Sequence, residues 1–150
     1  MSVRPYESSD REAVLALAPR LAIGVADWRN PELVHRAVEG WLSTAADQAH
    51  LDNHAVFVAV AADTVIGAVS VTERTHFTGE QDAYVGELAV AATHESQGIG
   101  AALMRAAEQW SRQRGLTRLT LETGAANTRA RRFYDRLGYH EEDVRLTKAL

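Results

Sequence analysis

The sequence lacks several features that would define whole classes of protein. It has no cysteine among its 150 residues, which excludes disulfides, thiolate metal sites and cysteine nucleophiles. It has no run of 18 apolar residues, and its first residues, MSVRPYESSD, do not form a secretion signal. Repeats and low-complexity tracts are also absent. We therefore expect one soluble domain over residues 1–150, located in the cytoplasm and not at a membrane.

The excess of acidic residues is unevenly distributed along the chain. The net charge is −4, which argues against general binding to nucleic acids. Residues 1–104 hold 14 acidic and 6 basic side chains, whereas residues 105–136 hold eight arginines and three acids. Two interpretations stay open. The charges belong to solvated helix faces, or a basic side serves a polyanionic ligand and an acidic side serves a cationic one.

Hydrophobic periodicity predicts a mixture of strands and helices. Strands are expected at residues 2–6, in two runs within 54–71 that turn near Asp63, at 83–91, at 116–123 and at 144–150. Helices are expected over 13–22, after Asn30, from Ile99 to a stop at Gly115, and over 128–137 up to Gly138. The order is an antiparallel stretch followed by β-α-β-α-β, so the fold class is α+β (mixed α/β).

Local signals set the helix starts and the faces that we expect to be buried. Ser9 and Glu12 fit a capping box, and Asn30 followed by Pro31 fits an N-cap and a first-turn proline. The helix after Asn30 is expected to bury Leu33, Val34, Ala37, Val38, Trp41 and Leu42. The helix from Ile99 is expected to bury Ile99, Leu103, Ala106 and Trp110.

The stretch Gln97-Gly98-Ile99-Gly100 stands between a predicted strand and a predicted helix. Glycines allow the backbone to approach a ligand, and the first N–H groups of a helix favour an anion. A P-loop is excluded because no Gly-Lys-Ser/Thr ending follows. A dinucleotide site is an alternative, with Glu122 as its ribose-binding acid, although Leu103 stands where that fingerprint needs a glycine.

A second motif, NTRARRFYDRLGY, places Asn127 and Tyr134 seven residues apart. In a helix these residues share nearly the same face, about 10 Å apart. Taken singly, Asn127 is also a typical N-cap and Tyr134 a typical core residue. His50 and His54 have the i,i+4 spacing of a metal pair, but no third ligand is evident and no metal site is expected.

The chain resembles the GNAT N-acetyltransferases, which use acetyl-CoA. The resemblance covers nearly the whole chain and rests on VRPYESSDREAV, ELAVAATHESQGIGAAL and NTRARRFYDRLGY. It implies a central mixed, mostly antiparallel twisted sheet flanked by helices. The implied coenzyme contacts are Leu88, Ala89 and Val90 to pantetheine, Ser96, Gln97, Gly98, Ile99, Gly100 and Ala101 to pyrophosphate, and Asn127 to either region.

Three positions depart from the usual family pattern. Glu95 replaces an Arg or Gln, Ser96 replaces a Gly, and Ala92 replaces a frequent Pro. The cradle works mainly through backbone N–H groups, so we expect it to persist. We expect Glu95 to point away into solvent, with Arg129, Arg131 or Arg132 compensating for the lost positive charge.

The resemblance implies chemistry in which an amine attacks the thioester directly. A lysine-like amine has a pKa of about 10.4 and must lose a proton to a base or a water chain. The candidate bases are Glu122, at the position of the base proposed in ribosomal-protein alanine acetyltransferases, and then Glu87. Tyr134 would stand at the thiol and supply a proton to the leaving group. No cysteine or metal is needed.

The acceptor is expected to be an amine of a small molecule or peptide. The acidic balance of residues 1–104 favours a cationic acceptor. A homodimer is left open. A second class of function is also left open, a regulatory module that binds coenzyme A without turnover. Turnover on a panel of amines separates that module from an enzyme.

Overall fold

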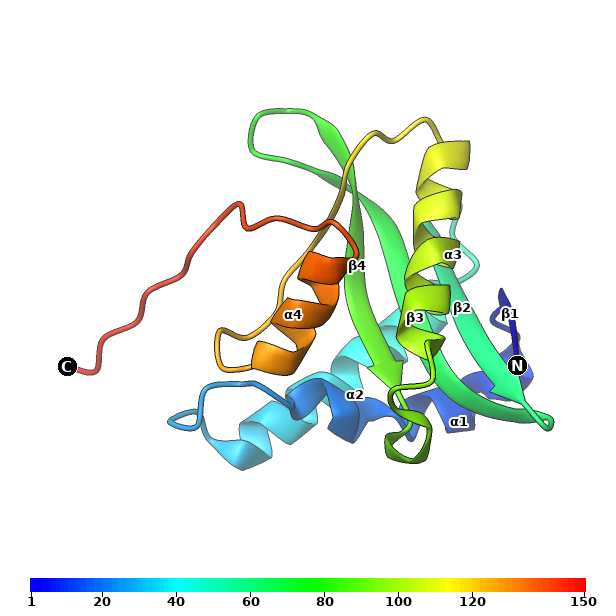
Figure 1. Ribbon diagram of the computed structural model, residues 1–150, viewed down its shortest axis with the longest axis horizontal. Coiled ribbons are helices and arrows are strands. Elements are labelled where there is room, and N and C mark those ends of the chain that lie inside the picture. Colours follow the sequence, from blue (N-terminus) through cyan, green and yellow to red (C-terminus); the bar gives the residue numbers. More distant parts are fainter.

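The computed structural model describes residues 1–150 and contains one five-stranded sheet with helices on both faces (Figure 1). Its strands are β1 (Ser2–Pro5), β2 (His54–Ala61), β3 (Thr64–Thr75), β4 (Gln81–Val90) and β5 (Leu119–Leu121). Its helices are η1 (Ser8–Asp10), α1 (Arg11–Leu15), η2 (Ala18–Ala22), α2 (Pro31–Gln48), η3 (Ala92–His94), α3 (Ile99–Gln113) and α4 (Thr128–Arg136). The expected α+β class is confirmed.

The strands lie in the order of the sequence, β1-β2-β3-β4-β5. The first three pairings are antiparallel and use short connections. Ala62 and Asp63 form the tight β2–β3 turn, and both have positive φ, which suits the twist of a two-residue hairpin. Only β4 and β5 are parallel, and α3 makes the crossover between them. A dinucleotide-binding fold needs a mostly parallel sheet, so this order is against that alternative.

Each face of the sheet carries its own apolar core. The cluster on the α3 face contains Ala59, Ile66, Val69, Val71, Ala83, Val85, Ile99, Leu103, Met104 and Ala107. The cluster against α1, η2 and α2 contains Val14, Leu17, Ala18, Val38, Leu42, Val58, Ala68 and Ala89. Strands β3 and β4 supply residues to both clusters because successive side chains alternate between faces.

The predicted stops of α3 and α4 are confirmed. Gly115 and Gly138 have φ of +75° and +91°, a conformation that glycine adopts without strain. After α4, the N–H of Tyr139 bonds to the carbonyl of Tyr134 at 3.0 Å, the pattern of a Schellman cap.

The N-terminal helix differs from the prediction. The capping box is formed by Glu7 and Asp10 instead of Ser9 and Glu12, and the backbone N–H of Glu7 donates to Asp10 at 2.9 Å. Arg4 also donates to both oxygens of Asp10, at 2.7 and 2.8 Å. The ion pair with Arg4 stabilises the carboxylate of Asp10 in the position where it caps the helix. The following segment is short and continues as 3₁₀ turns.

Three predicted core residues of α2 are exposed. Leu33 is 58% exposed, Trp41 is 49% exposed and Ala37 is also exposed, whereas Val38, Leu42 and Ala46 are buried. The apolar residues of α2 extend around more of the helix than the sheet can cover. On α3, Ile99 and Leu103 are buried as expected, but Ala106 and Trp110 are only half-buried.

The predicted last strand, at residues 144–150, does not form. These residues extend away from the sheet after α4, and Val144, Leu146 and Leu150 are exposed (Figure 1). Alternation of apolar residues favours a strand only where an edge is within reach, and the chain leaves α4 in another direction. No helix of this fold has both the length and the apolar character that crossing a bilayer requires.

Candidate active site

Strand β4 carries a bulge near its centre. The register with β3 shifts between Val69 and Val71, so that Gly86 and Glu87 of β4 together lie opposite Ser70. The hydroxyl of Ser70 accepts a hydrogen bond from the backbone N–H of Glu87 at 3.1 Å and donates one to the carboxylate of Glu87. A bulge adds one residue to a strand and bends it.

Beyond the bulge, β4 has one unpaired edge. Residues 83–85 pair with residues 119–121 of β5, and this parallel pairing ends there. Residues 88–90 still pair with β3 on their other side. Leu88, Ala89 and Val90, three of the predicted coenzyme contacts, therefore lie on an edge that no strand pairs, where an extended ligand can bond to the backbone, although the carbonyl of Val90 already accepts from the side chain of Arg20.

The glycine turn presents a row of unpaired backbone donors. None of the N–H groups from Ser96 to Ala101 donates to an acceptor within the chain. Ser96 and Gly98 have φ of +62° and +77°, which turns the loop into the start of α3. A Cβ added to Gly98 would meet nothing within 4 Å, so the space beside the turn is open. Such a row, at a helix N-terminus, favours an anion.

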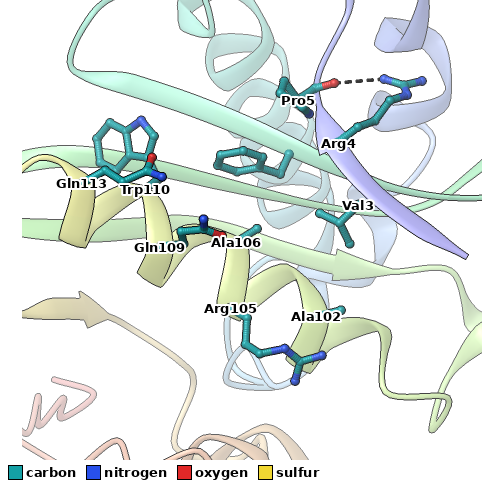
Figure 2. Close-up of a pocket in the computed structure, with 10 residues that line it drawn as sticks. Val3, Arg4, Pro5, Ala102, Arg105, Ala106, Gln109, Trp110 and Gln113 are labelled. Carbon is teal, nitrogen blue, oxygen red and sulfur yellow. Dashed lines mark hydrogen bonds between the residues drawn. The ribbon is translucent and has the colours of Figure 1, made fainter.

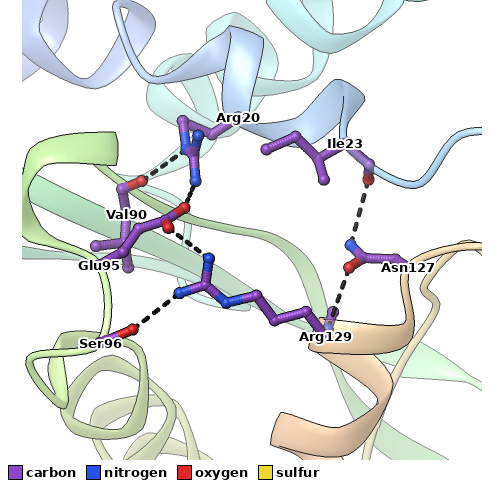
Figure 3. Close-up of polar contacts among 8 residues, drawn as sticks. Arg20, Ile23, Val90, Glu95, Ser96, Asn127 and Arg129 are labelled. Atoms are coloured by element: carbon purple, nitrogen blue, oxygen red, sulfur yellow. Dashed lines mark hydrogen bonds and ion pairs between the residues drawn. The ribbon is translucent and has the colours of Figure 1, made fainter.

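Glu95 does not point freely into solvent, which corrects the expectation. One carboxylate oxygen pairs with Arg20 of η2 and the other with Arg129 of α4 (Figure 3). Arg129 also donates to the hydroxyl of Ser96 at 3.0 Å, and Arg20 donates to the carbonyl of Val90 at 3.0 Å. Sequence alone does not reveal that two arginines, one before and one after the loop, converge on this acid.

Asn127 caps α4 and ties two loops together. Its side-chain oxygen accepts from the backbone N–H of Ala130 at 3.1 Å, and its amide donates to the carbonyl of Ile23 at 3.2 Å. A Cβ on Gly24 would lie 2.2 Å from that of Asn127, so this approach requires glycine. The N-cap interpretation is confirmed, and the predicted contact of Asn127 with the coenzyme stays a prediction.

Tyr134 lies on the side of α4 that packs against the body of the protein. Its ring contacts Phe133, with centroids 5.0 Å apart, and Tyr139, at 5.9 Å. Burial raises the pKa of Tyr134 to about 12. Phe133 in turn packs against the first turn of α3, where a Cβ on Gly100 would lie 3.2 Å from the ring. The helix of Tyr134 is therefore held directly against the glycine turn.

A polar patch lies on the sheet face opposite α3. Ala83 and Val85 belong to the α3 core, so Tyr84, which stands between them, points to the other face. Glu87 points to the same face because the bulge changes the alternation. The guanidinium of Arg74 lies 4.2 Å from the centre of the Tyr84 ring.

The charges of both candidate bases, Glu122 and Glu87, affect the pKa of Tyr84 in this patch. Burial raises the pKa of Tyr84, and the charge of Glu122 raises it further, with a smaller contribution from Glu87. Burial also raises the pKa of Glu87, while the hydrogen bond from Ser70 opposes that rise. The structure therefore brings Glu87 and Glu122 near one ring. Tyr84 was not among the predicted site residues.

Other parts of the surface do not add to this site. The groove of about 500 Å³ between α3 and β1 lies on another side of the sheet and is lined by residues such as Val3, Arg105 and Trp110 (Figure 2). His54 bonds to Asn53 at 2.7 Å. No group of three or more His, Asp or Glu side chains is arranged to hold a metal ion.

The chain matches a known protein family and resembles several known proteins. The family described as "Acetyltransferase (GNAT) family" matches residues 22–139. N-alpha-acetyltransferase 30 of Schizosaccharomyces pombe is 35% identical over 83 residues, which are 55% of this chain and 55% of that protein. The chain thus matches about half the length of this curated relative.

Solved structures share the fold over the full chain. The tetramutant of the BH1408 protein from Bacillus halodurans has a TM-score of 0.81 at 17% identity, with 100% of both chains covered. The aminoglycoside antibiotic 6'-N-acetyltransferase AAC(6')-IG from Acinetobacter haemolyticus has a TM-score of 0.70 at 18% identity, with 100% of this chain and 99% of that chain covered. The chain belongs to the GNAT family, whose acetyltransferases use acetyl-CoA.

Proposed function

We propose that this protein moves the acetyl group of acetyl-CoA to a primary amine of a small molecule or peptide, by direct attack of the amine. The observation that carries the proposal is the free N–H row from Ser96 to Ala101, next to the unpaired edge at residues 88–90. Coenzyme A has a diphosphate followed by an arm of amide groups. The row suits the diphosphate, and the strand edge suits the amides.

The remaining predicted contacts agree with this placement. Arg129 brings a positive charge beside Ser96, at the start of the N–H row. The side-chain amide of Asn127 already accepts one hydrogen bond, from Ala130, and donates one, to Ile23. A contact with the coenzyme would use its second N–H or the second lone pair of its oxygen. Tyr134 extends from the same helix, with its hydroxyl donating to no other group of the chain, which suits a donor to a ligand.

The reaction forms a C–N bond and breaks the C–S bond of the thioester. Acetyl-CoA supplies the activated acyl group. The amine must lose a proton, and Glu122 and Glu87 lie on the sheet face where a carboxylate could accept it, directly or through water. The raised pKa of Glu87 makes its carboxylate a stronger base than that of an ordinary glutamate. Tyr134 keeps its proton up to about pH 12 and is available to donate to the departing sulfur.

The acceptor is a cationic amine in this proposal. Two carboxylates, Glu87 and Glu122, lie beside the patch around Tyr84, and residues 1–104 are acidic as a whole. The likeness to an N-alpha-acetyltransferase supports the α-amine of a peptide. With a pKa of about 7.7–8.0, an α-amine needs less help to lose its proton than a lysine side chain.

The test is release of the coenzyme thiol, followed with a thiol reagent. The protein contains no cysteine, so it contributes no background. The acceptors are a basic peptide with a free N-terminus, the same peptide with a blocked N-terminus, an acidic peptide and a polyamine. We expect the fastest release with the free basic peptide. A preference for the acidic peptide would contradict a cationic acceptor.

The alternative of a regulatory module gives a different outcome. In that case the protein binds acetyl-CoA in a calorimeter, and no amine releases thiol above the rate without protein. The polar patch around Tyr84 favours the enzyme, because coenzyme binding alone does not require two carboxylates there.

A further inference from the structure

The loop that presents the free N–H row also carries an acid that holds two arginines. Glu95 uses one carboxylate oxygen for Arg20 and the other for Arg129. The three residues come from η2, the loop before α3 and the first turn of α4, and their side chains meet beside Ser96, the first residue of the row (Figure 3). An acid at this position repels a diphosphate unless its charge is compensated.

The two arginines are held differently. Arg20 is 26% exposed at its side chain and has a second bond, to the carbonyl of Val90 in β4. Arg129 is 64% exposed, and its other bond is to the hydroxyl of Ser96. Arg20 is thus anchored to the sheet, whereas Arg129 is bound only through the loop. Arg129 is the partner that can leave Glu95 without disturbing the core.

Arg129 lies where a phosphate would arrive. Its guanidinium spans Glu95 and Ser96, and Ser96 begins the row of free N–H groups. The planar fork that now contacts a carboxylate and a hydroxyl can instead form two parallel bonds to a phosphate. The carboxylate of Glu95 therefore occupies the arginine that the diphosphate needs.

We propose that Glu95 is an internal counter-ion that competes with the coenzyme. Binding of the coenzyme transfers Arg129 from Glu95 to the pyrophosphate, while Arg20 stays on Glu95 and neutralises it. This inference rests on the proposed function, because it assumes that the row binds the pyrophosphate. It assigns Glu95 a role opposite to that of a positively charged residue at this position: it keeps Arg129 in place in the free protein and lowers coenzyme affinity.

The test is a double-mutant cycle of Glu95→Gln and Arg129→Gln, with coenzyme affinity measured by calorimetry. Glu95→Gln should tighten binding by up to about fivefold, the scale of a partly exposed ion pair. Arg129→Gln should weaken it. In the Arg129→Gln background, Glu95→Gln should change affinity less than about twofold, because the freed arginine is gone.

Two controls separate this exchange from other effects. Asp47→Asn makes the same change in net charge at the remote Arg11–Asp47 pair and should leave affinity unchanged. Dephospho-CoA, which keeps the pyrophosphate but lacks the 3'-phosphate, should show the same tightening as CoA. Loss of the tightening with dephospho-CoA would overturn the assignment to the pyrophosphate.

The remaining outcomes are also decisive. If Glu95→Gln weakens binding, or tightens it equally with and without Arg129, then Glu95 is a structural tie and the exchange does not occur. If the wild-type protein binds neither CoA nor dephospho-CoA, the proposed function itself fails. Melting curves of each variant show whether the fold is retained.

Discussion

Ser70 and Glu87 are joined by two hydrogen bonds across the bulge of β4. The hydroxyl of Ser70 accepts from the backbone N–H of Glu87 and donates to its carboxylate. The bulge directly follows Val85, the last residue of β4 that pairs with β5, and it brings Glu87 to the same face as Tyr84. The unpaired edge proposed for the coenzyme and the polar patch proposed for the amine therefore meet at the bulge.

The first prediction concerns Glu87→Gln and its effect on stability. Burial raises the pKa of Glu87 in the folded protein. The folded state therefore favours the protonated acid, and this stability is present below the unfolded pKa of about 4.3 and lost as pH rises through the folded pKa. Glutamine avoids the loss. We expect the variant to melt higher than wild type at pH 7, with the difference shrinking near pH 4.

The activity of the same variant should move in the opposite direction. If Glu87 accepts the proton of the amine, the Glu87→Gln variant loses turnover at neutral pH. The variant is then more stable than wild type but has a lower turnover rate. Ser70→Thr is the matched control, because it changes the partner of Glu87 but keeps the hydroxyl and the carboxylate, and it should keep its turnover. A Glu87→Gln protein that melts lower than wild type at pH 7 would contradict this prediction. It would show that the charged carboxylate stabilises the bulge.

The second prediction concerns Glu122→Gln, which keeps the size of the side chain and removes its basicity. Turnover should fall by about 10²–10⁴ at neutral pH if Glu122 is the base, and by less at high pH, where more amine is already neutral. Rates measured from pH 6 to pH 10 check this. Glu141→Gln removes a carboxylate in the tail and should leave the profile unchanged. An equal loss at every pH would assign Glu122 a structural role.

The sequence predicts much of this fold because its signals are local. Asn127, Gly115 and Gly138 mark helix ends through backbone geometry, and the structure places all three as expected. The glycine turn is also read correctly as the start of α3, since its glycines and the following apolar stripe lie within one short segment.

The errors come from features that depend on distant residues. The bulge at Glu87 involves Ser70 on another strand, so the sequence did not predict that Tyr84 and Glu87 share a face of the sheet. Glu95 is oriented by Arg20 and Arg129, which lie far from it in sequence. The tail at residues 144–150 alternates like a strand, but it extends away from the sheet after α4 and pairs with no strand.

The third prediction concerns Gly98→Ala. Gly98 has φ +77°, which costs about 1–2 kcal/mol for an alanine, and the added methyl would enter the open space beside the N–H row. We expect coenzyme affinity to fall at least tenfold. Gly115→Ala is the matched control, since Gly115 has φ +75° and open surroundings at the other end of α3.

Both variants should lose similar stability, and only Gly98→Ala should lose affinity. Equal affinities in the two variants would place the coenzyme away from the glycine turn. Gly100 is less suitable for this test, because a Cβ there would lie 3.2 Å from the ring of Phe133 and disturb the packing of α4.

The last prediction concerns Tyr134→Phe, which removes a hydroxyl and keeps the ring. The hydroxyl donates to no other group of the chain, so stability and coenzyme affinity should change little. Turnover should fall by about 10²-fold, near the lower limit for general acid catalysis. The reason is that burial raises the pKa of Tyr134 to about 12, while a thiol has a pKa of about 8.5, so this phenol is a weak acid toward the departing sulfur.

Tyr139→Phe is the matched control for this prediction. Its ring lies 5.9 Å from that of Tyr134, but its hydroxyl donates to Glu108 at 3.0 Å. The control should therefore lose stability and keep its turnover, the reverse of Tyr134→Phe. Steady-state rates with an accepted amine and melting curves for both variants distinguish the two residues. A fully active Tyr134→Phe enzyme would show that the thiolate leaves without this hydroxyl, and the proton would then have to come from solvent.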